Sequence, residues 1–215
     1  LGGIPVVGGE GDGGNRLQVA VGEEFEGYSP RGLAVEDDFV AVGVAPFPDA
    51  VGFVAGGEGD ARALEQLSFA RAVVPFVQGN AEVEFGGRRR RTTIYGVGPA
   101  MPEAFRMHVS AGRFLPEDNP TAPRALVVLG SKMREELFGD ASALGQLITI
   151  SGSRFRVVGV MESKGTVLGF DLDDTVYIPA ARALSLFNVE GLIEIDVMYQ
   201  EGVPVARVVE GIRQI

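Results

Sequence analysis

The chain has 215 residues, of which 46% are hydrophobic, and this is enough to form the core of one large domain or two small ones. Its 29 acidic and 19 basic side chains give a formal net charge of −10, which disfavours nucleic acid and anionic membrane surfaces as partners. There is no cysteine, so a disulfide framework and a thiolate metal site are excluded.

No apolar run approaches the roughly 18 residues that a membrane span requires. The chain opens with Leu1-Gly2-Gly3, without an initiator methionine or a signal peptide. We therefore expect an excised segment of a longer protein, attached to a membrane only through flanking helices that it does not contain.

The first third of the chain combines a glycine-rich start with short apolar runs. Residues 1–14 cannot bury enough apolar surface to offset their ordering entropy, which predicts a flexible lead-in. Residues 17–21 alternate between apolar and polar side chains, as in a strand. The runs at 39–44 and 51–54 are predicted to pair as a hairpin or to form an ordered loop.

A helix and a set of strands are expected next. Asp60 is a plausible N-cap for a short helix over residues 61–67. Strands are predicted at 73–77, 81–85 and 90–97, with Gln78-Gly79-Asn80 between the first two and a Gly86-Gly87 turn before the third.

The rest of the chain alternates between strands and helices, and its strongest pattern lies at residues 125–161. That stretch predicts a strand at 125–130, a helix ending near Gly139, and strands at 147–150 and 155–160 joined by a tight turn. Around it we expect a helical turn at 101–105, loops at 112–118 and 163–169, strands at 175–179 and 193–198, and helices at 180–187 and 203–215. The fold class is α+β, with residues 100–187 as an insertion.

Two glycine-rich segments, residues 8–12 and 56–60, share the sequence Gly-Gly-Glu-Gly-Asp. Glycines with acids could indicate a calcium or phosphate site, but a phosphate loop requires a terminal Gly-Lys-Ser/Thr, and calcium repeats require tandem nonapeptides. We interpret both segments as solvated loops.

Asp171-Leu172-Asp173-Asp174-Thr175 matches a phosphotransferase pattern in which the first Asp attacks phosphorus and the second acts as acid and base. It resembles motif one of the haloacid dehalogenase superfamily in its residue types only. A strand is predicted directly after it, and few residues of the chain remain after it to supply the other catalytic groups. The favoured hypothesis is structural, with these carboxylates accepting hydrogen bonds from backbone amides.

The other charged residues do not define a catalytic site. Arg88-Arg89-Arg90-Arg91 is predicted to pair with acids or to face an acidic partner. The single histidine, His108, has no obvious catalytic partner, and we expect it to be half exposed. Because no catalytic signature appears, we predict no enzymatic activity, catalytic residue, metal or cofactor for this segment.

A series of motifs from residue 112 onward is recognisable by its order and spacing. They are Gly112-Arg113-Phe114-Leu115, Val127-Val128-Leu129-Gly130, Leu137-Phe138-Gly139, Leu144-Gly145-Gln146, Phe155-Arg156-Val157-Val158-Gly159-Val160, Asp173-Asp174 and Val176-Tyr177-Ile178-Pro179. In this order they resemble the extracytoplasmic core domain of MacB-type ABC transporter permeases, a superfamily that includes FtsX and LolCE. The resemblance covers about residues 60–215.

The resemblance implies a two-lobed domain in the periplasm, carried by a permease of the inner membrane. A porter-like subdomain (15–99 and 188–215) would be split by an inserted, β-rich, sabre-like subdomain (100–187). The segment 34–58 is longer than the corresponding segment in the family pattern. Residues 1–14 take the place of a helix that, in the family, rises from the membrane.

The implied function is to transmit an ATP-driven conformational change to substrate export or to a periplasmic partner. The implied partners are a second permease protomer, a cytoplasmic ATPase and a periplasmic adaptor. Efflux and lipoprotein export both occur among such relatives. Two alternatives stay open: a free periplasmic binding module with a small apolar ligand between its lobes, and a phosphotransferase using Asp171 and Asp173.

Overall fold

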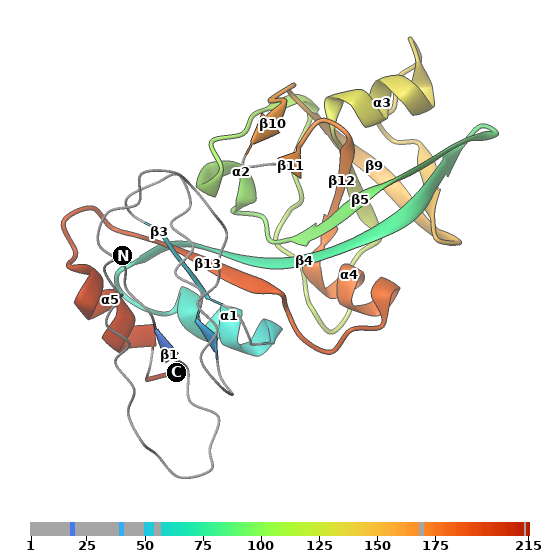
Figure 1. Ribbon diagram of the computed structural model, residues 1–215. Coiled ribbons are helices and arrows are strands. Elements are labelled where there is room, and N and C mark those ends of the chain that lie inside the picture. The colour runs from blue at the N-terminus through green and yellow to red at the C-terminus, as the bar shows by residue number, and fades with distance from the viewer. Residues whose placement is uncertain (1–17, 20–38, 41–49, 54–56, 168–169, 213) are drawn as a thin grey trace, which may run out of the picture.

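The structure is a computed structural model that describes residues 18–19, 39–40, 50–53, 57–167, 170–212 and 214–215 (Figure 1). The predicted lead-in at residues 1–14, which contains the first Gly-Gly-Glu-Gly-Asp segment, lies outside the described residues. None of the helices in the described ranges is long and apolar enough to cross a bilayer.

Helices and strands are mixed along the whole described chain, as the sequence predicts. Their order is β1 (Gln18–Val19), β2 (Phe39–Val40), β3 (Ala50–Phe53), α1 (Glu58–Glu65), β4 (Ala70–Phe85), β5 (Arg88–Val97), α2 (Met101–Ala104), β6 (Val109–Gly112), β7 (Leu126–Leu129), α3 (Ser131–Phe138), β8 (Leu147–Ile150), β9 (Ser153–Met161), β10 (Thr166–Val167), β11 (Phe170–Asp171), β12 (Thr175–Pro179), α4 (Ala180–Phe187), β13 (Glu194–Tyr199) and α5 (Val205–Ile212).

A nine-stranded sheet connects these elements. Its order is β3-β13-β4-β5-β12-β7-β9-β6, and β8 pairs with both β4 and β9. This double pairing closes β4, β5, β12, β7, β9 and β8 into a ring of six strands. The first half of β4 instead pairs with β13, which in turn pairs with β3 in an open part of the sheet.

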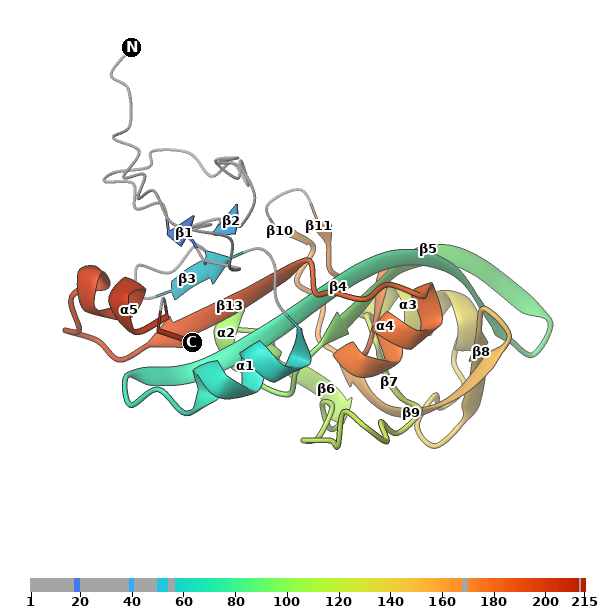
Figure 2. The same cartoon turned by 90° about the horizontal axis from the view of Figure 1, so that it is seen from below.

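The β4–β5 hairpin belongs to both the open part and the ring, and we call it the spine (Figures 1 and 2). Gly86 and Gly87, with φ of 57° and 82°, form its turn, which requires positive φ at both positions. The prediction of separate strands at 73–77 and 81–85 is wrong. Gln78-Gly79-Asn80 pairs in register with Tyr95, Ile94 and Thr93, so β4 is one strand of 16 residues.

The sheet buries apolar side chains on both faces because successive residues of a strand point to opposite sides. On one face Val73, Val83 and Ile94 pack with α1, α3 and α4. On the other face Val74 and Tyr95 pack with α2 and the segment before β7. The core is therefore continuous along the spine.

Helix α4 packs against the spine through two strand glycines. A Cβ at Gly79 would overlap the Phe187 ring, and one at Gly96 would overlap the Ala183 methyl. Because glycine has no side chain, these two positions allow the helix to approach the strands closely.

The prediction for residues 125–161 is confirmed: β7, α3, β8 and β9 occupy the expected places, and the strand and helix at 175–187 are also confirmed. The C-terminal helix is shorter than predicted, because α5 ends at Ile212. Three strands were not predicted: β6, and β10 and β11, which form a small hairpin. Of these, only β10 lies wholly within a predicted loop, residues 163–169.

Two predictions near the N-terminus need correction. In the described residues β2 pairs with β1 and β3 pairs with β13, so the runs at 39–44 and 51–54 do not form a hairpin. The N-cap of α1 is Gly57 rather than Asp60, so residues 58–60 of the second Gly-Gly-Glu-Gly-Asp segment form the first turn of a helix and not a loop. Asp60 lies one turn into the helix, where its carboxylate accepts a hydrogen bond from Gly57 N–H at 2.7 Å.

Candidate functional site

The acidic segment 171–174 lies between β11 and β12, where β12 enters the ring beside β5. Asp174 receives a two-pronged hydrogen bond from Arg90 of β5, with Nε 2.8 Å from Oδ1, and Lys132 of α3 lies 3.3 Å from its other oxygen. The Arg90 hydrogen bond is the main reason why the pKa of Asp174 lies below its usual value. This contact joins β5, α3 and the segment before β12.

Asp171 and Asp173 hold the backbone of the same region. Asp171 Oδ1 accepts hydrogen bonds from the amides of Asp173 and Asp174, at 3.1 and 3.0 Å. Asp173 accepts from the amides of Lys164 and Gly165, at 2.8 and 3.0 Å, and from the Ser163 hydroxyl at 2.6 Å. Burial would raise the pKa of Asp173, but these hydrogen bonds lower it.

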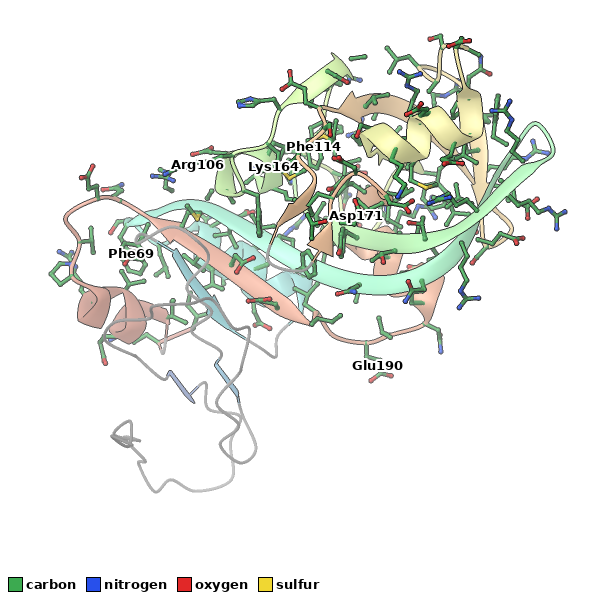
Figure 3. All side chains as sticks on the ribbon, turned by 45° about the horizontal axis from the view of Figure 1, so that its top comes forward. Phe69, Arg106, Phe114, Lys164, Asp171 and Glu190 are labelled. Carbon is green, nitrogen blue, oxygen red and sulfur yellow. The ribbon has the colours of Figure 1, made fainter. Side chains whose placement is uncertain are left out.

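Lys164 extends this network to α2. Its ammonium group donates to the carbonyls of Phe105 and Arg106, at 2.6 and 2.7 Å, and Figure 3 shows Lys164 next to Arg106. The predicted structural role, accepting hydrogen bonds from backbone amides, is therefore confirmed for Asp171 and Asp173, whereas the Asp174 carboxylate binds the side chains of Arg90 and Lys132. Because Asp173 is fixed by three donors, the geometry does not favour a phosphotransferase in which it would transfer protons.

Among the four arginines near the turn of the spine, the predicted pairing with acids is confirmed for Arg89 and Arg90. Arg89 lies 3.4 Å from Glu84 and 3.7 Å from Glu82, and Arg90 binds Asp174. Arg88 donates to the backbone carbonyl of Glu136 at 3.3 Å. His108 is exposed, and the described residues contain no group of three histidine, cysteine or acidic side chains arranged to hold a metal ion.

A cavity of about 410 Å³ lies between α1, the segment 115–123 and the start of α4. Its walls include six prolines, which come from β4, the connection between β5 and α2, the segment before β7 and the end of β12: Pro75, Pro99, Pro116, Pro120, Pro123 and Pro179. Proline rings are apolar, have a fixed φ and offer no N–H group. They therefore give the cavity stiff, apolar patches on walls that also contain polar side chains.

Charged side chains from two segments complete the cavity: Glu58, Arg62 and Glu65 from α1, and Glu117 and Asp118 from the segment opposite. Burial raises the pKa of Glu58, although Arg62 and the Ala181 amide oppose this. Burial and the nearby Glu117 raise the pKa of Glu65.

Asp118 differs from the other acids in this cavity. Burial would raise its pKa, but hydrogen bonds from the Arg124 amide and guanidinium at 2.7 and 3.0 Å, together with the Asn119 amide, lower it. Asp118 is thus neutralised by Arg124.

The sequence interpretation did not identify this cavity, because its walls come from segments more than a hundred residues apart in the chain. A usable signal existed in the spacing of Pro116, Pro120 and Pro123. Three prolines so close together indicate an irregular, stiff segment. Where such a segment packs can be learned only from the tertiary structure.

The ring, the spine and the paired charges define a mixed α/β domain whose conspicuous charged residues stabilise its own structure. Residues 14–215 match the MacB-like periplasmic core domain family, and the chain belongs to this family. It is thus a periplasmic core domain of the kind found in MacB-type ABC transporter permeases, an extracytoplasmic part of a membrane transporter.

Named relatives include exporters from several bacteria. The chain is 26% identical over 151 residues to the macrolide export ATP-binding/permease protein MacB of Bdellovibrio bacteriovorus, covering 70% of the chain and 23% of that protein. It is 31% identical over 175 residues to the pyoverdine export ATP-binding/permease protein PvdT of Pseudomonas aeruginosa, covering 80% and 26%. The chain thus spans about a quarter of the length of these relatives.

Solved structures show the same fold. The periplasmic region of MacB from Actinobacillus actinomycetemcomitans superposes with a TM-score of 0.65 at 20% identity, covering 78% of this chain and 82% of that one. The extracellular domain of the noncanonic ABC-type transporter YknZ from Gram-positive bacteria gives 0.59 at 17% identity, covering 77% and 80%.

Proposed function

We propose that this domain is a mechanical element of an inner-membrane ABC transporter. It transmits an ATP-driven conformational change from the permease helices to substrate export or to a periplasmic partner. ATP is hydrolysed by a cytoplasmic domain or subunit, and the domain itself is not an enzyme. A second permease protomer and a periplasmic adaptor are its other partners.

The spine is the observation that carries this proposal. Helix α5 and the C-terminus lie at one end of the molecule, and the turn of the spine lies at the other (Figures 1 and 2). Strand β4 pairs with β13, which leads to α5, and continues without a break to its pairing with β8 in the ring. A displacement at one end therefore acts on the other through one backbone and its hydrogen bonds.

The paired charges support the same role, because they limit bending between the spine and its neighbours. Arg90 and Asp174 join β5 to the segment before β12, and Asp173 fixes the loop at Lys164 and Gly165. A force transmitter must resist deformation, and a well-packed, fully bonded sheet does so.

We further propose that the domain works as two subdomains, a porter-like one (15–99 and 188–215) and an inserted sabre-like one (100–187). The spine belongs to the porter-like subdomain but pairs with the insertion, since residues 93–97 of β5 pair in parallel with residues 175–179 of β12. Such sharing would make the two subdomains move together.

A free binding module is the second candidate function, and the cavity of about 410 Å³ is the observation that favours it. The phosphotransferase alternative lacks support of this kind, because the hydrogen bonds of Asp171 and Asp173 go to the backbone of their own loop.

The mechanical proposal can be tested in the full-length transporter, reconstituted in liposomes. Replacing exposed Gln78 and Asn80 of β4 by glycine softens the middle of the spine without altering the core. The matched control replaces exposed Arg154 and Arg156 of β9 by glycine, because β9 pairs with β6, β7 and β8 but not with the spine. ATP hydrolysis and export of a macrolide and of pyoverdine, the compounds named in its relatives, are measured for each protein.

We expect the spine variant to hydrolyse ATP like the wild type and to export less substrate per ATP, while the control keeps both activities. Unchanged export per ATP in the spine variant would show that the spine does not transmit the movement. If the wild type exports neither compound, its substrate differs from those named for these relatives.

A further inference from the structure

The proline-walled cavity has the features of a small-molecule site that the mechanical role does not require. Its volume of about 410 Å³ lies within the range of sites for small ligands. Its walls come from the spine, from α1 and from the 115–123 segment, so it is held by elements on several sides.

The charges around the cavity do not cancel. Asp118 is neutralised by Arg124, which leaves Arg62 against Glu58, Glu65 and Glu117. Among the described residues no ion pair within 4.0 Å involves Glu65 or Glu117. The cavity therefore carries about two uncompensated negative charges beside the proline rings.

Glu65 and Glu117 also repel each other across the cavity, because they project from α1 and from the segment opposite. Both side chains are exposed, so they lie at the open side of the cavity, and a cation placed between them is attracted by both carboxylates. An apolar body attached to the cation would contact the proline rings and Leu115.

We propose that this cavity binds an organic cation with an apolar body, such as an alkylammonium ion, with the ammonium group between Glu65 and Glu117. A neutral molecule of the same shape would gain only the apolar contacts, and an anion would be repelled. The site depends on the cavity alone and not on the mechanical role proposed above.

The test uses this 215-residue chain and three probes of equal chain length: n-octylammonium, 1-octanol and octanoate. The homologous periplasmic region of MacB has been crystallised separately from the rest of its transporter, so a domain of this type can be studied alone. Calorimetric titration gives the affinity and stoichiometry of each probe. The variants are Glu65→Gln and Glu117→Gln, and the control is Glu190→Gln, an exposed glutamate in the turn after α4 (Figure 3).

We expect octylammonium to bind with one-to-one stoichiometry and about tenfold more tightly than octanol, and octanoate not to bind. Each cavity variant should weaken octylammonium binding about fivefold and leave octanol unaffected, and the control should match the wild type. Thermal melts check that the variants are folded.

Equal affinities for octylammonium and octanol would overturn the proposal, as would the absence of saturable binding. Full affinity in both glutamine variants would place the ligand elsewhere and overturn it too. If a variant does not fold, the comparison of the three probes on the wild type decides alone. None of these outcomes concerns export per ATP, so the two proposals can fail separately.

Discussion

Gly96 of β5 lies so close to Ala183 of α4 that a Cβ at residue 96 would overlap the Ala183 methyl group. The contact sets how closely α4 approaches the spine. A glycine in such close contact should not tolerate a side chain, whereas a glycine with open space at the Cβ position should.

Gly96→Ala should lower the free energy of unfolding by about 1–3 kcal/mol, because the added methyl must displace α4 or bend β5. Gly59→Ala is the matched control, since no atom lies within 4 Å of its Cβ and it occupies a helix. The control should be neutral or slightly stabilising. Urea denaturation measures both, and equal midpoints would show that α4 does not press on the spine.

Arg90 and Asp174 are predicted to be coupled energetically. Their side chains are 30% and 20% exposed, and a two-pronged hydrogen bond joins them, so solvent screens them only partly. A double-mutant cycle with Arg90→Met and Asp174→Asn should give a coupling of about 1–3 kcal/mol. The neighbouring Arg91, exposed in β5, serves as the control position through Arg91→Met, which should change stability by less than about 0.5 kcal/mol.

A pH effect is predicted at Asp196, which is 6% exposed in the middle of β13. Burial raises its pKa well above 3.8, and the neighbouring Glu194 adds to this. The folded protein therefore keeps a proton that the unfolded chain loses above about pH 4. The free energy of unfolding should fall as the pH rises from about 4 through the raised pKa.

Asp196→Asn cannot lose a proton and should flatten this part of the stability profile. Glu201→Gln, at an exposed turn after β13, is the control and should keep the wild-type slope. Thermal melts between pH 4 and pH 9 make the comparison. A wild-type profile that is flat or rises over this range would contradict the environment described for Asp196.

The parts of the fold that the sequence predicts well are those with local signals. Residues 125–161 combine short apolar runs with glycines at their ends, and each run becomes an element at its expected place. Gln78-Gly79-Asn80 looks like a turn because each residue is common in turns. In the folded chain, pairing with β5 and the packing of Phe187 over Gly79 outweigh that local preference.

In the candidate sites too, local interactions could be predicted from the sequence and long-range ones could not. The amide-binding role of Asp171 and Asp173 could be predicted, because short acidic side chains next to a turn commonly accept local amides. The partner of Arg90 could not, since Asp174 lies 84 residues away and only the parallel pairing of β5 with β12 brings them together. The cavity likewise depends on tertiary packing of distant prolines.

The central claim is that the domain moves as a stiff unit, and a distance measurement tests it directly. The chain has no cysteine, so Glu82→Cys near the turn of the spine and Glu201→Cys beside α5 can each carry a spin label. Other cysteines of the full-length transporter are first removed, and doubly labelled protomers are diluted with unlabelled ones.

Pulsed electron–electron double resonance then gives the distance between the two labels in one protomer, both without nucleotide and in the vanadate-trapped state. A second sample, labelled only at residue 82 in both protomers, reports the distance between the two domains. We predict that the distance within a protomer stays constant while the distance between protomers changes. A change in the distance within the protomer upon trapping would contradict the account.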